Sequence, residues 1–435
     1  MSNKVTLFYR KEKAFHLSFD CDATSSDGGL ILLDKIEQQT KCIKSFGSVI
    51  PDNRDPSYID HPIEKILRQR VFMLAMGYED CNDSDYLKHD VLLQQVLGGE
   101  VCSQHTLSRF ENSISKHTLW ALADWWIGKY VANLDPGQKE VIIDVDCTDD
   151  PTHGAQQLSC FHGYYWQWMY NEMFFLDGTT GQMILPVLRP GNVHSSKWMA
   201  KILSRIVKAI RERFPQICII IRADAGYSGA TFYKMAEEYA LDFCLGIATN
   251  NRIESFIREE YDQVKEQYAD KGIKHQKFVG PFYYQADSWD RPQATYAKIE
   301  STGKGMNVRY FVSNMHNYEV EDLYWNFYVQ RGEAAENRIK EIKNFCFSDR
   351  LSCHSFWANY FRLMLSCLAY ELLRTIRVLI RKTAKQYAWK WNIQSIRLYL
   401  LKVAAQLKER VRYVIIKLSK TFTQQNLMKE IIALC

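Results

Sequence analysis

Three features of the 435-residue chain predict a mixed α/β fold with helical regions at both ends. Apolar residues recur at helical spacing from Pro62 to Lys129, and helical spacing returns after residue 320. Between these regions, short apolar runs typical of buried strands end at Asp146 and Asp224. The sequence is 47% hydrophobic, which is enough for a large core, and its length favours two or three domains.

The first region, residues 1–135, is expected to be mainly helical. Within it, Leu92–Leu97 and Ser103–Phe110 flank a glycine pair and predict a helix, a turn and a second helix with Ser103 as its N-cap. A helix-turn-helix of this kind would present Arg109 to a DNA major groove. An ordinary helical hairpin gives the same pattern and is the commoner explanation.

Strand patterns begin after residue 135 and continue to about residue 250. The expected order is a strand ending at Asp146, a hairpin over 163–188, a helix over 196–214, a strand ending at Asp224, a helix over 231–240 and a strand over 243–247. This β-β-β-α-β-α-β order matches an RNase H-like sheet, in which the first strand is central and pairs with the fourth. Residues 136–250 are therefore the first part of such a core.

The remaining chain is expected to hold three further regions. Residues 251–320 read as a β-rich insertion, and residues 321–350 return to the core with a helix that carries Glu336. Residues 351–435 form a basic helical region with fifteen Lys and Arg against three acids, in a chain of net charge +5. A basic segment beside an acidic body suits a protein that holds a polyanion, although a solvated helix face looks similar.

Composition excludes several other classes. No run of eighteen apolar residues and no signal-like leader is present, so a cytoplasmic protein without membrane contact is expected. The twelve cysteines show no Cys-x-x-Cys spacing, which argues against a zinc or redox motif.

The candidate chemistry is in three carboxylates: Asp146, Asp224 and Glu336. Acids carried out of a sheet and off a helix can converge on hard cations, as a two-metal phosphoryl-transfer centre requires. Asp144 lies two residues before Asp146 on the same strand face and is the rival first ligand. Taken alone, Asp146 or Asp224 is better explained as a turn or cap residue, and it is their joint occurrence in this strand order that favours a metal site.

The third carboxylate lies in a basic helix pattern. Glu336, Lys340 and Lys343 are spaced i, i+4, i+7, which places them on one helix face and would put two phosphate-binding ammoniums beside a metal-binding acid. Ordinary surface Glu-Lys pairs have the same spacing.

Taken together, these motifs resemble a known family. The shared motifs are Asp146-x-Thr148, Ala223-Asp224-x-Gly226, Tyr328-x-x-Arg331 and Glu336-Asn337-x-Ile339-Lys340-Glu341. They are similar to those of DDE transposases of bacterial insertion sequences, most closely insertion sequence family 1380. That family is related to the insertion sequence family 4 group and, more distantly, to the piggyBac elements.

The resemblance implies that Asp146, Asp224 and Glu336 bind two Mg²⁺ ions, for which Mn²⁺ substitutes. It also implies that Tyr328 and Arg331 contact transposon-end phosphates, and that Lys343 holds the transferred strand. The chain departs from the related pattern in one respect, because four residues rather than three separate Arg331 from Glu336. One extra residue turns an α-helix by about 100°, so both side chains share a face only if the helix begins between them, and Gly332 would permit that start.

Relatives also carry, in their β-rich insertion, an aromatic side chain that stacks on a flipped base. Trp289 is the candidate for this role, with a tryptophan packed on its own hairpin as the alternative.

The implied function is that of a transposase, bacterial and nucleoid-associated. It would bind double-stranded DNA, both the terminal inverted repeats and the target, as a homodimer and would catalyse Mg²⁺-dependent strand cleavage and transfer. Two alternatives stay open. One is a catalytically silent DNA-binding protein on the same scaffold, and the other is an RNase H-like nuclease without strand transfer.

Overall fold

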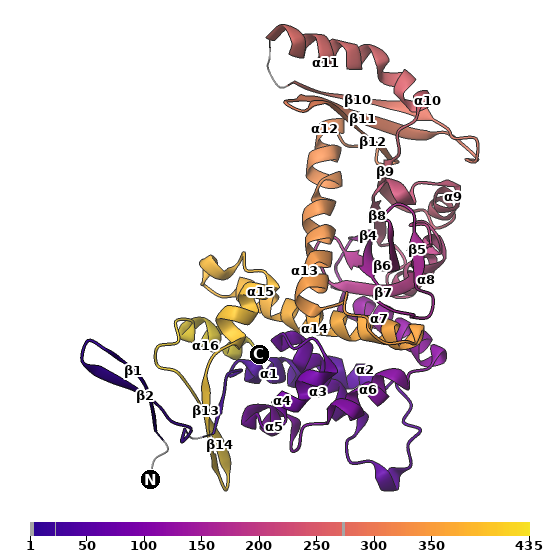
Figure 1. Ribbon diagram of the computed structural model, residues 1–435. Helices are drawn as coiled ribbons and strands as arrows, with labels where there is room; N and C mark the ends of the chain where they lie inside the picture. The colour runs from indigo at the N-terminus through magenta and orange to yellow at the C-terminus, as the bar shows by residue number, and fades with distance from the viewer. Residues whose placement is uncertain (1–3, 22, 272–274) are drawn as a thin grey trace. The chain divides into compact units, whose positions relative to one another are not determined.

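The computed structural model describes residues 4–21, 23–271 and 275–435 (Figure 1). The chain forms two compact units. The smaller unit comprises Met1–Ser113, Phe345–Phe347 and Leu368–Cys435, and the larger comprises Ile114–Asn344 and Ser348–Cys367. No helix in the described part of the chain is both long and apolar enough to cross a membrane.

The larger unit is built on one mixed sheet. Its strands are β4 (Glu140–Pro151), β5 (Cys160–His162), β6 (Gln167–Asp177), β7 (Met183–Pro190), β8 (Cys218–Ala223), β9 (Asp242–Ile247), β10 (Gln276–Tyr284), β11 (Gln293–Thr302) and β12 (Gly305–Ser313). Along the sheet the order is β10-β11-β12-β9-β8-β4-β6-β5, and β7 pairs with β6. The sheet is mixed because β8 is parallel to both β4 and β9 whereas the other pairs are antiparallel.

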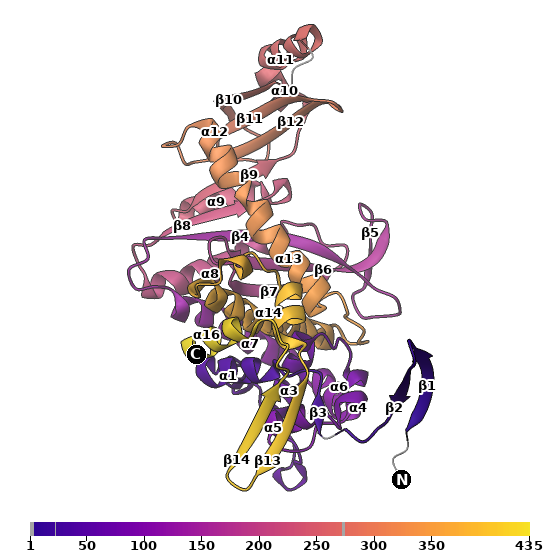
Figure 2. The same cartoon turned by 90° about the vertical axis from the view of Figure 1, so that its left-hand side faces the viewer.

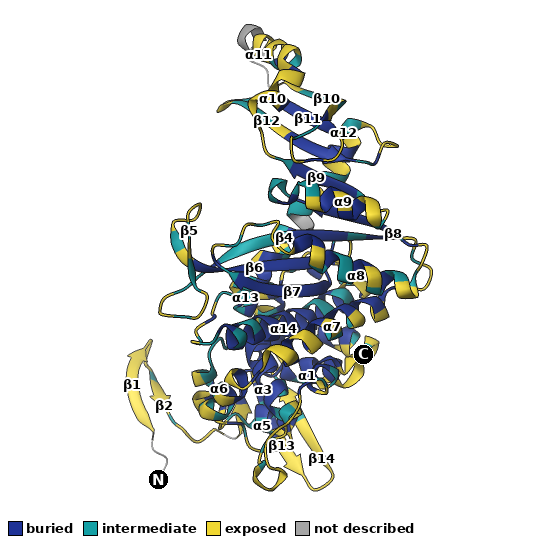
Figure 3. Cartoon of the chain, turned by 90° about the vertical axis from the view of Figure 1, so that its right-hand side faces the viewer, coloured by how far each residue is buried: buried dark blue, intermediate teal, exposed yellow. Residues whose placement is uncertain are grey.

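This topology confirms the RNase H-like order expected from the sequence. The first long strand, β4, is central and pairs in parallel with β8, the strand that follows the β6–β7 hairpin and a helix. The short edge strand β5 is an addition that the pattern did not predict. Strands β6 to β8 are almost wholly buried (Figure 3), which explains why their sequences read as continuous apolar runs instead of alternating ones.

Helices cover both faces of the sheet. The helices of the larger unit are α7 (Lys116–Asn133), α8 (Met199–Arg213), α9 (Ala230–Glu238), α10 (Asn251–Glu254), α11 (Arg258–Lys271), α12 (Val320–Asp322), α13 (Asn337–Cys346) and the first part of α14 (Phe356–Lys382). Figures 1 and 2 show α8 and α9 on one face and the segment from α12 to α13 on the other. Helix α7 also belongs to this unit, which begins at Ile114, and the domain boundary expected at residue 135 stays a prediction.

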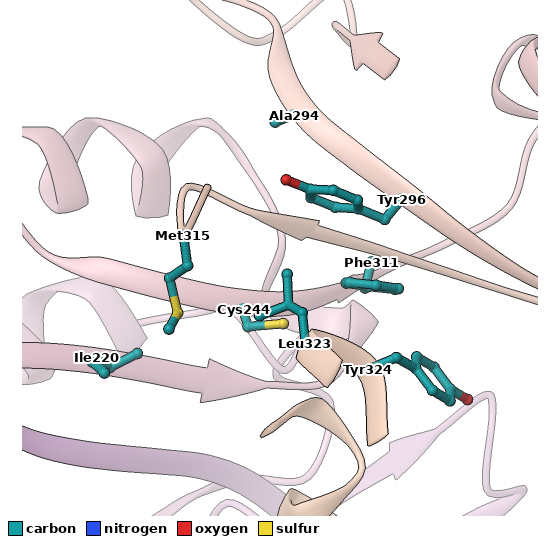
Figure 4. Close-up of a cluster of buried hydrophobic side chains, with 8 residues drawn as sticks. All are labelled: Ile220, Cys244, Ala294, Tyr296, Phe311, Met315, Leu323 and Tyr324. Atoms are coloured by element: carbon teal, nitrogen blue, oxygen red, sulfur yellow. The ribbon is translucent and has the colours of Figure 1, made fainter. Parts of the chain in front are cut away.

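The β-rich insertion is continuous with the core. Strand β12 pairs with β9, so β10 to β12 extend the same sheet. A buried apolar cluster joins the two parts (Figure 4), and its members come from the core strands, from the insertion and from the start of the helical segment that carries Glu336. They are Ile220, Cys244, Ala294, Tyr296, Phe311, Met315, Leu323 and Tyr324.

The smaller unit brings the two ends of the chain together. Its helices are α1 (Leu30–Thr40), α2 (Cys42–Gly47), α3 (Ile63–Met76), α4 (Ser84–Leu87), α5 (Val91–Leu97), α6 (Gln104–Asn112), α15 (Ile393–Ile396), α16 (Gln425–Leu434) and the rest of α14. The N-terminal strands are β1 (Val5–Arg10), β2 (Lys13–Leu17) and β3 (Thr24–Ser25). The C-terminal strands are β13 (Ala405–Arg410) and β14 (Tyr413–Leu418), and β13 pairs with β3.

The expectation of a wholly helical C-terminal region is therefore wrong for residues 405–418. These residues form the β13–β14 hairpin. The reason is local, since Val414, Ile415 and Ile416 are β-branched and favour extended backbone.

The predicted helix, turn and helix near residue 100 are confirmed as α5 and α6. Ser103 is the N-cap of α6, and its hydroxyl accepts a hydrogen bond from the backbone N–H of Thr106 at 3.3 Å. A buried ion pair of 2.7 Å between Arg70 of α3 and Glu111 fixes α6 to α3. Arg109, on the same helix as Glu111, is exposed to solvent. Its proposed role in DNA binding stays a prediction.

Candidate active site

The sheet register brings Asp146 and Asp224 level with each other. Strands β4 and β8 are parallel, and their last paired residues are Val145 and Ala223, so the two aspartates are the next residues on neighbouring strands. Strand β8 stops there, and the Asp224 carboxylate accepts the backbone N–H of Gly226 at 2.8 Å. Strand β4 does not stop at Asp146, as the sequence had suggested, but continues to Pro151 along β6. The Asp146 side chain, 13% exposed, lies at the edge of the sheet core because its neighbour β8 ends, and not because β4 does.

Asp144, the rival first ligand, is already paired. Both of its carboxylate oxygens accept hydrogen bonds from the Arg222 guanidinium, at 2.6 and 2.8 Å, and both side chains are buried. Arg222 also donates to the backbone carbonyl of Phe327 at 2.8 Å. This bidentate pair engages both carboxylate oxygens of Asp144 in a buried setting, so the geometry favours Asp146 as the ligand.

Glu336 lies close to Asp146 through a shared partner. The Arg331 guanidinium donates to Asp146 Oδ2 at 2.8 Å and to Glu336 Oε1 at 3.1 Å. Burial raises the pKa of Asp146 to about 6; Arg331 opposes this rise, whereas the negative charges of Asp224 and Glu336 add to it. Asp146 therefore lies within electrostatic range of both Asp224 and Glu336, and the role of the three acids as metal ligands stays a prediction.

A π turn explains how Arg331 and Glu336 come to share a face. The segment over residues 320–346, which we call the carboxylate helix, keeps right-handed helical backbone angles through Val329 and Arg331. Its Gly332–Glu336 part is π-helical, with hydrogen bonds that close one residue later than in an α-helix, so residues five apart face the same side. The expectation that a helix begins at Gly332 is wrong, because the π turn absorbs the extra residue inside a continuous helix.

The chemistry of the donor set suits a hard divalent cation. Asp146, Asp224 and Glu336 supply carboxylate oxygens, the ligands that Mg²⁺ and Mn²⁺ prefer. Among the described residues, however, no group of three or more His, Cys, Asp or Glu side chains is arranged as a ready metal site. The Arg331 guanidinium lies between two of the three acids and pairs with both.

The basic residues of the carboxylate helix have separate surroundings. Lys343 Nζ donates to the Thr148 hydroxyl at 3.1 Å and to the Asp149 carbonyl at 2.6 Å, so its ammonium group is bound to β4. Lys340 is exposed. The two lysines therefore do not present a common surface, and of the pair expected to bind phosphate only Lys340 is open to solvent.

Tyr328 packs at the edge of the site. Its ring stacks on Phe311 with a centroid distance of 5.7 Å, and burial raises its pKa to about 12. A Cβ atom at Gly246 would lie 2.6 Å from the Tyr328 hydroxyl oxygen and 2.8 Å from the Ala225 nitrogen. Only glycine at position 246 lets Tyr328 approach the turn that carries Asp224.

Trp289 has the surroundings of a core residue. It is 8% exposed, and its ring makes edge contacts with Tyr233 and Tyr284 at 4.7 and 5.4 Å. Trp289 therefore packs both on Tyr284 of its own hairpin and on Tyr233 of α9, and its proposed role in base stacking stays a prediction.

Arg189 is a supporting residue that the sequence did not reveal. Its buried guanidinium donates to Asn171 Oδ1 at 3.1 Å and to the carbonyls of Ser195 and Lys197 at 2.9 and 2.8 Å. The loop held in this way places the Ser195 hydroxyl 3.5 Å from Cys147 Sγ, beside Asp146. An isolated arginine at the end of an apolar strand gave no signal of this role.

A second buried acid pair lies farther along β4. Asp150 and Glu172 are diagonal neighbours on β4 and β6, and both are fully buried. Ser348 donates to Glu172 at 2.9 Å, whereas neither carboxyl oxygen of Asp150 has a hydrogen-bond partner among the described residues. Burial raises the pKa of both carboxyl groups; each also has other acids nearby, and Lys343 opposes the rise.

We expect this pair to make the protein less stable as the pH rises. A carboxyl group whose pKa is higher in the folded state keeps a proton that the unfolded chain has lost, so stability falls from about pH 5 to about pH 9. Asp150→Asn should reduce that fall in melting temperature by several degrees, since about 1 kcal/mol corresponds to about 2–4 °C for a unit of this size. Thermal unfolding at a series of pH values measures it. The exposed control Asp287→Asn should leave the slope unchanged, and an unchanged slope in Asp150→Asn would contradict the assignment.

An RNase H-like sheet with Asp146 and Asp224 on neighbouring parallel strands, faced by a helix that carries Glu336, defines a DDE-type transposase fold. The chain belongs to the family described as transposase DDE domain group 1, whose model matches residues 9–434. No curated protein matches the chain. Among solved structures it is similar to a piggyBac transposase in a synaptic complex with hairpin DNA. The identity is 13% and the TM-score 0.44, over 86% of this chain and 80% of that one. The narrower assignment to insertion sequence family 1380 stays a prediction.

Proposed function

We propose that this transposase binds the terminal inverted repeats of an insertion sequence, cleaves one DNA strand with a divalent metal ion and joins the freed 3′-hydroxyl to target DNA. The observation that carries the proposal is the approach of Asp146, Asp224 and Glu336 from two strands and a helix. Three carboxylates on separate rigid elements are costly to gather unless a cation is meant to bind among them.

The protein residues would divide the work as follows. Asp146, Asp224 and Glu336 would hold two Mg²⁺ or Mn²⁺ ions, which supply charge stabilisation to the attacking and leaving oxygens when bound. Arg331 and Tyr328 would orient the end phosphates, and Lys340 would add positive charge nearby. In this scheme no protein nucleophile is needed, because water and then the DNA 3′-hydroxyl attack phosphorus.

The smaller unit would bind DNA. Exposed Arg109 on α6 and the basic C-terminal region are suited to duplex phosphates or base edges. Joining two ends requires that they be held together, so we expect a homodimer on DNA.

The π turn favours a catalytic protein over a silent binder. The silent alternative rests on the shifted Arg331 to Glu336 spacing, and the π turn returns both residues to one face. The direct experiment incubates the protein with a duplex whose sequence is the terminal repeat flanking its gene, in Mg²⁺ or Mn²⁺. Nicked and joined products support the proposal, nicks alone indicate a nuclease, and binding without cleavage indicates the silent scaffold.

Deleting Ala334 tests the π turn itself. The shortened helix should close to α spacing and keep Arg331 and Glu336 on one face, so strand cleavage should stay within about tenfold of the wild-type rate. Asn337 lies in the α-helical part, where no π turn can absorb a deletion. Removing it rotates the two halves of the helix by about 100° relative to each other. Cleavage in that variant should fall by about a hundredfold or more, as a misplacement of 1 Å can already do. Cleavage rates and melting temperatures of the two deletions measure this, and equal losses would contradict it.

A further inference from the structure

Arg331 is the closest positive charge to two of the three acids. Its guanidinium bridges Asp146 and Glu336 at 2.8 and 3.1 Å, and its side chain is only 13% exposed. Asp224 also lies within electrostatic range of it. The arginine is therefore the buried counter-ion of the acid cluster, and not a surface residue that waits for a ligand.

A metal ion and this guanidinium compete for the same oxygens. Mg²⁺ binds carboxylate oxygens at about 2.0–2.1 Å, which is closer than a guanidinium nitrogen and leaves no room for the N–H donors between the same two acids. The contact of Arg331 with Asp146 must therefore break before the ion is bound.

We propose that Arg331 is a positioning residue that competes with the metal ion. It binds the carboxylates of Asp146 and Glu336 in the free protein and releases them when a DNA phosphate binds its guanidinium. This inference rests on the proposed function. Arginine pairs with phosphate in the same two-pronged way as with carboxylate, so the exchange conserves its hydrogen bonds. Metal would then enter chiefly after DNA has bound.

Thermodynamic linkage gives the proposal a quantitative form. If DNA removes the competitor, DNA must tighten metal binding, and metal must tighten DNA binding by the same factor. A purely structural salt bridge would predict no such coupling. Removing the arginine would only loosen the helix.

The test measures Mn²⁺ binding by electron paramagnetic resonance on the full chain without DNA. Arg331→Gln keeps the length and some hydrogen bonding but removes the charge, so it should bind Mn²⁺ at least about tenfold more tightly than wild type. Arg338→Gln is the matched control, because Arg338 lies on the same helix and pairs with Glu341 at 3.1 Å, away from Asp146. It removes the same charge and should leave Mn²⁺ affinity unchanged.

The second arm adds the terminal-repeat duplex. Wild type should bind Mn²⁺ more tightly with the duplex than without it, and Arg331→Gln should show a much smaller change. The inference would be overturned if wild type and Arg331→Gln bound Mn²⁺ with equal affinity, or if Arg338→Gln raised the Mn²⁺ affinity as much as Arg331→Gln does. Neither result would contradict the proposed metal site. Failure of every variant to bind Mn²⁺, with Asp146→Asn no different from wild type, would instead overturn the proposed function.

Discussion

Asp146→Asn is expected to abolish metal-dependent strand cleavage while the protein stays folded. The substitution keeps the size of the side chain and removes the charge that, under the proposed function, would attract a divalent ion. Charge stabilisation by the ions contributes several kcal/mol to phosphoryl transfer, and each 1.4 kcal/mol or so is a factor of ten. The cleavage rate on the terminal-repeat duplex should therefore fall by about a thousandfold or more. In the wild type this carboxylate is buried near other acids, so the melting temperature of the Asp146→Asn protein should be equal to or higher than that of the wild type.

Matched variants separate this loss from a structural one. Asp224→Asn and Glu336→Gln should lose cleavage to a similar extent. Asp149→Asn should keep most of it, because Asp149 lies on the opposite face of the same strand and pairs with Lys343 at 3.4 Å. Cleavage that survives in Asp146→Asn, or is lost equally in Asp149→Asn, would remove Asp146 from the site.

The strand order and the approach of Asp146 to Asp224 and Glu336 could be predicted because both follow from local sequence patterns, whereas the role of these acids as metal ligands stays a prediction. A buried parallel strand reads as a continuous apolar run, and the first polar residue after it marks where a carboxylate can leave the core. Asp224 follows this rule. Asp146 was also selected by this rule, although its own strand β4 continues past it. It lies at the edge of the core because the neighbouring strand β8 ends.

Partner choice could not be predicted from the same patterns. Helical spacing places Lys343 on the face of Glu336, but it does not reveal that the ammonium bonds to Thr148 and Asp149. A lone tryptophan between polar residues gave no sign that Tyr233, 56 positions earlier, would cover Trp289. The π turn was also hidden, because a count of residues shows an excess of one but not whether a helix restarts or widens to absorb it. Each of these depends on contacts distant in sequence or on backbone strain.

The Asp144–Arg222 pair is expected to hold the sheet together without taking part in cleavage. Its two side chains come from adjacent strands β4 and β8 and are buried. Breaking such a pair leaves one charge without compensation and destabilises a protein by about 3–5 kcal/mol. Arg222→Met should have this effect, measured by urea unfolding. Burial raises the pKa of Asp144 and Arg222 opposes the rise, so without the arginine the acid would keep its proton and the loss would grow as the pH rises.

The double variant Asp144→Leu with Arg222→Met makes this prediction specific. Replacing both charges by apolar side chains removes the uncompensated ion, so most of the lost stability should return and its dependence on pH should disappear. Full recovery is not expected, because Arg222 also donates to the carbonyl of Phe327 at 2.8 Å, and an unpaired buried carbonyl costs about 1–3 kcal/mol. Asp144→Leu alone should be as unstable as Arg222→Met, since it buries an unpaired guanidinium. If the double variant unfolds as readily as either single one, the pair is held by something other than mutual charge, and Asp144 returns as a candidate ligand.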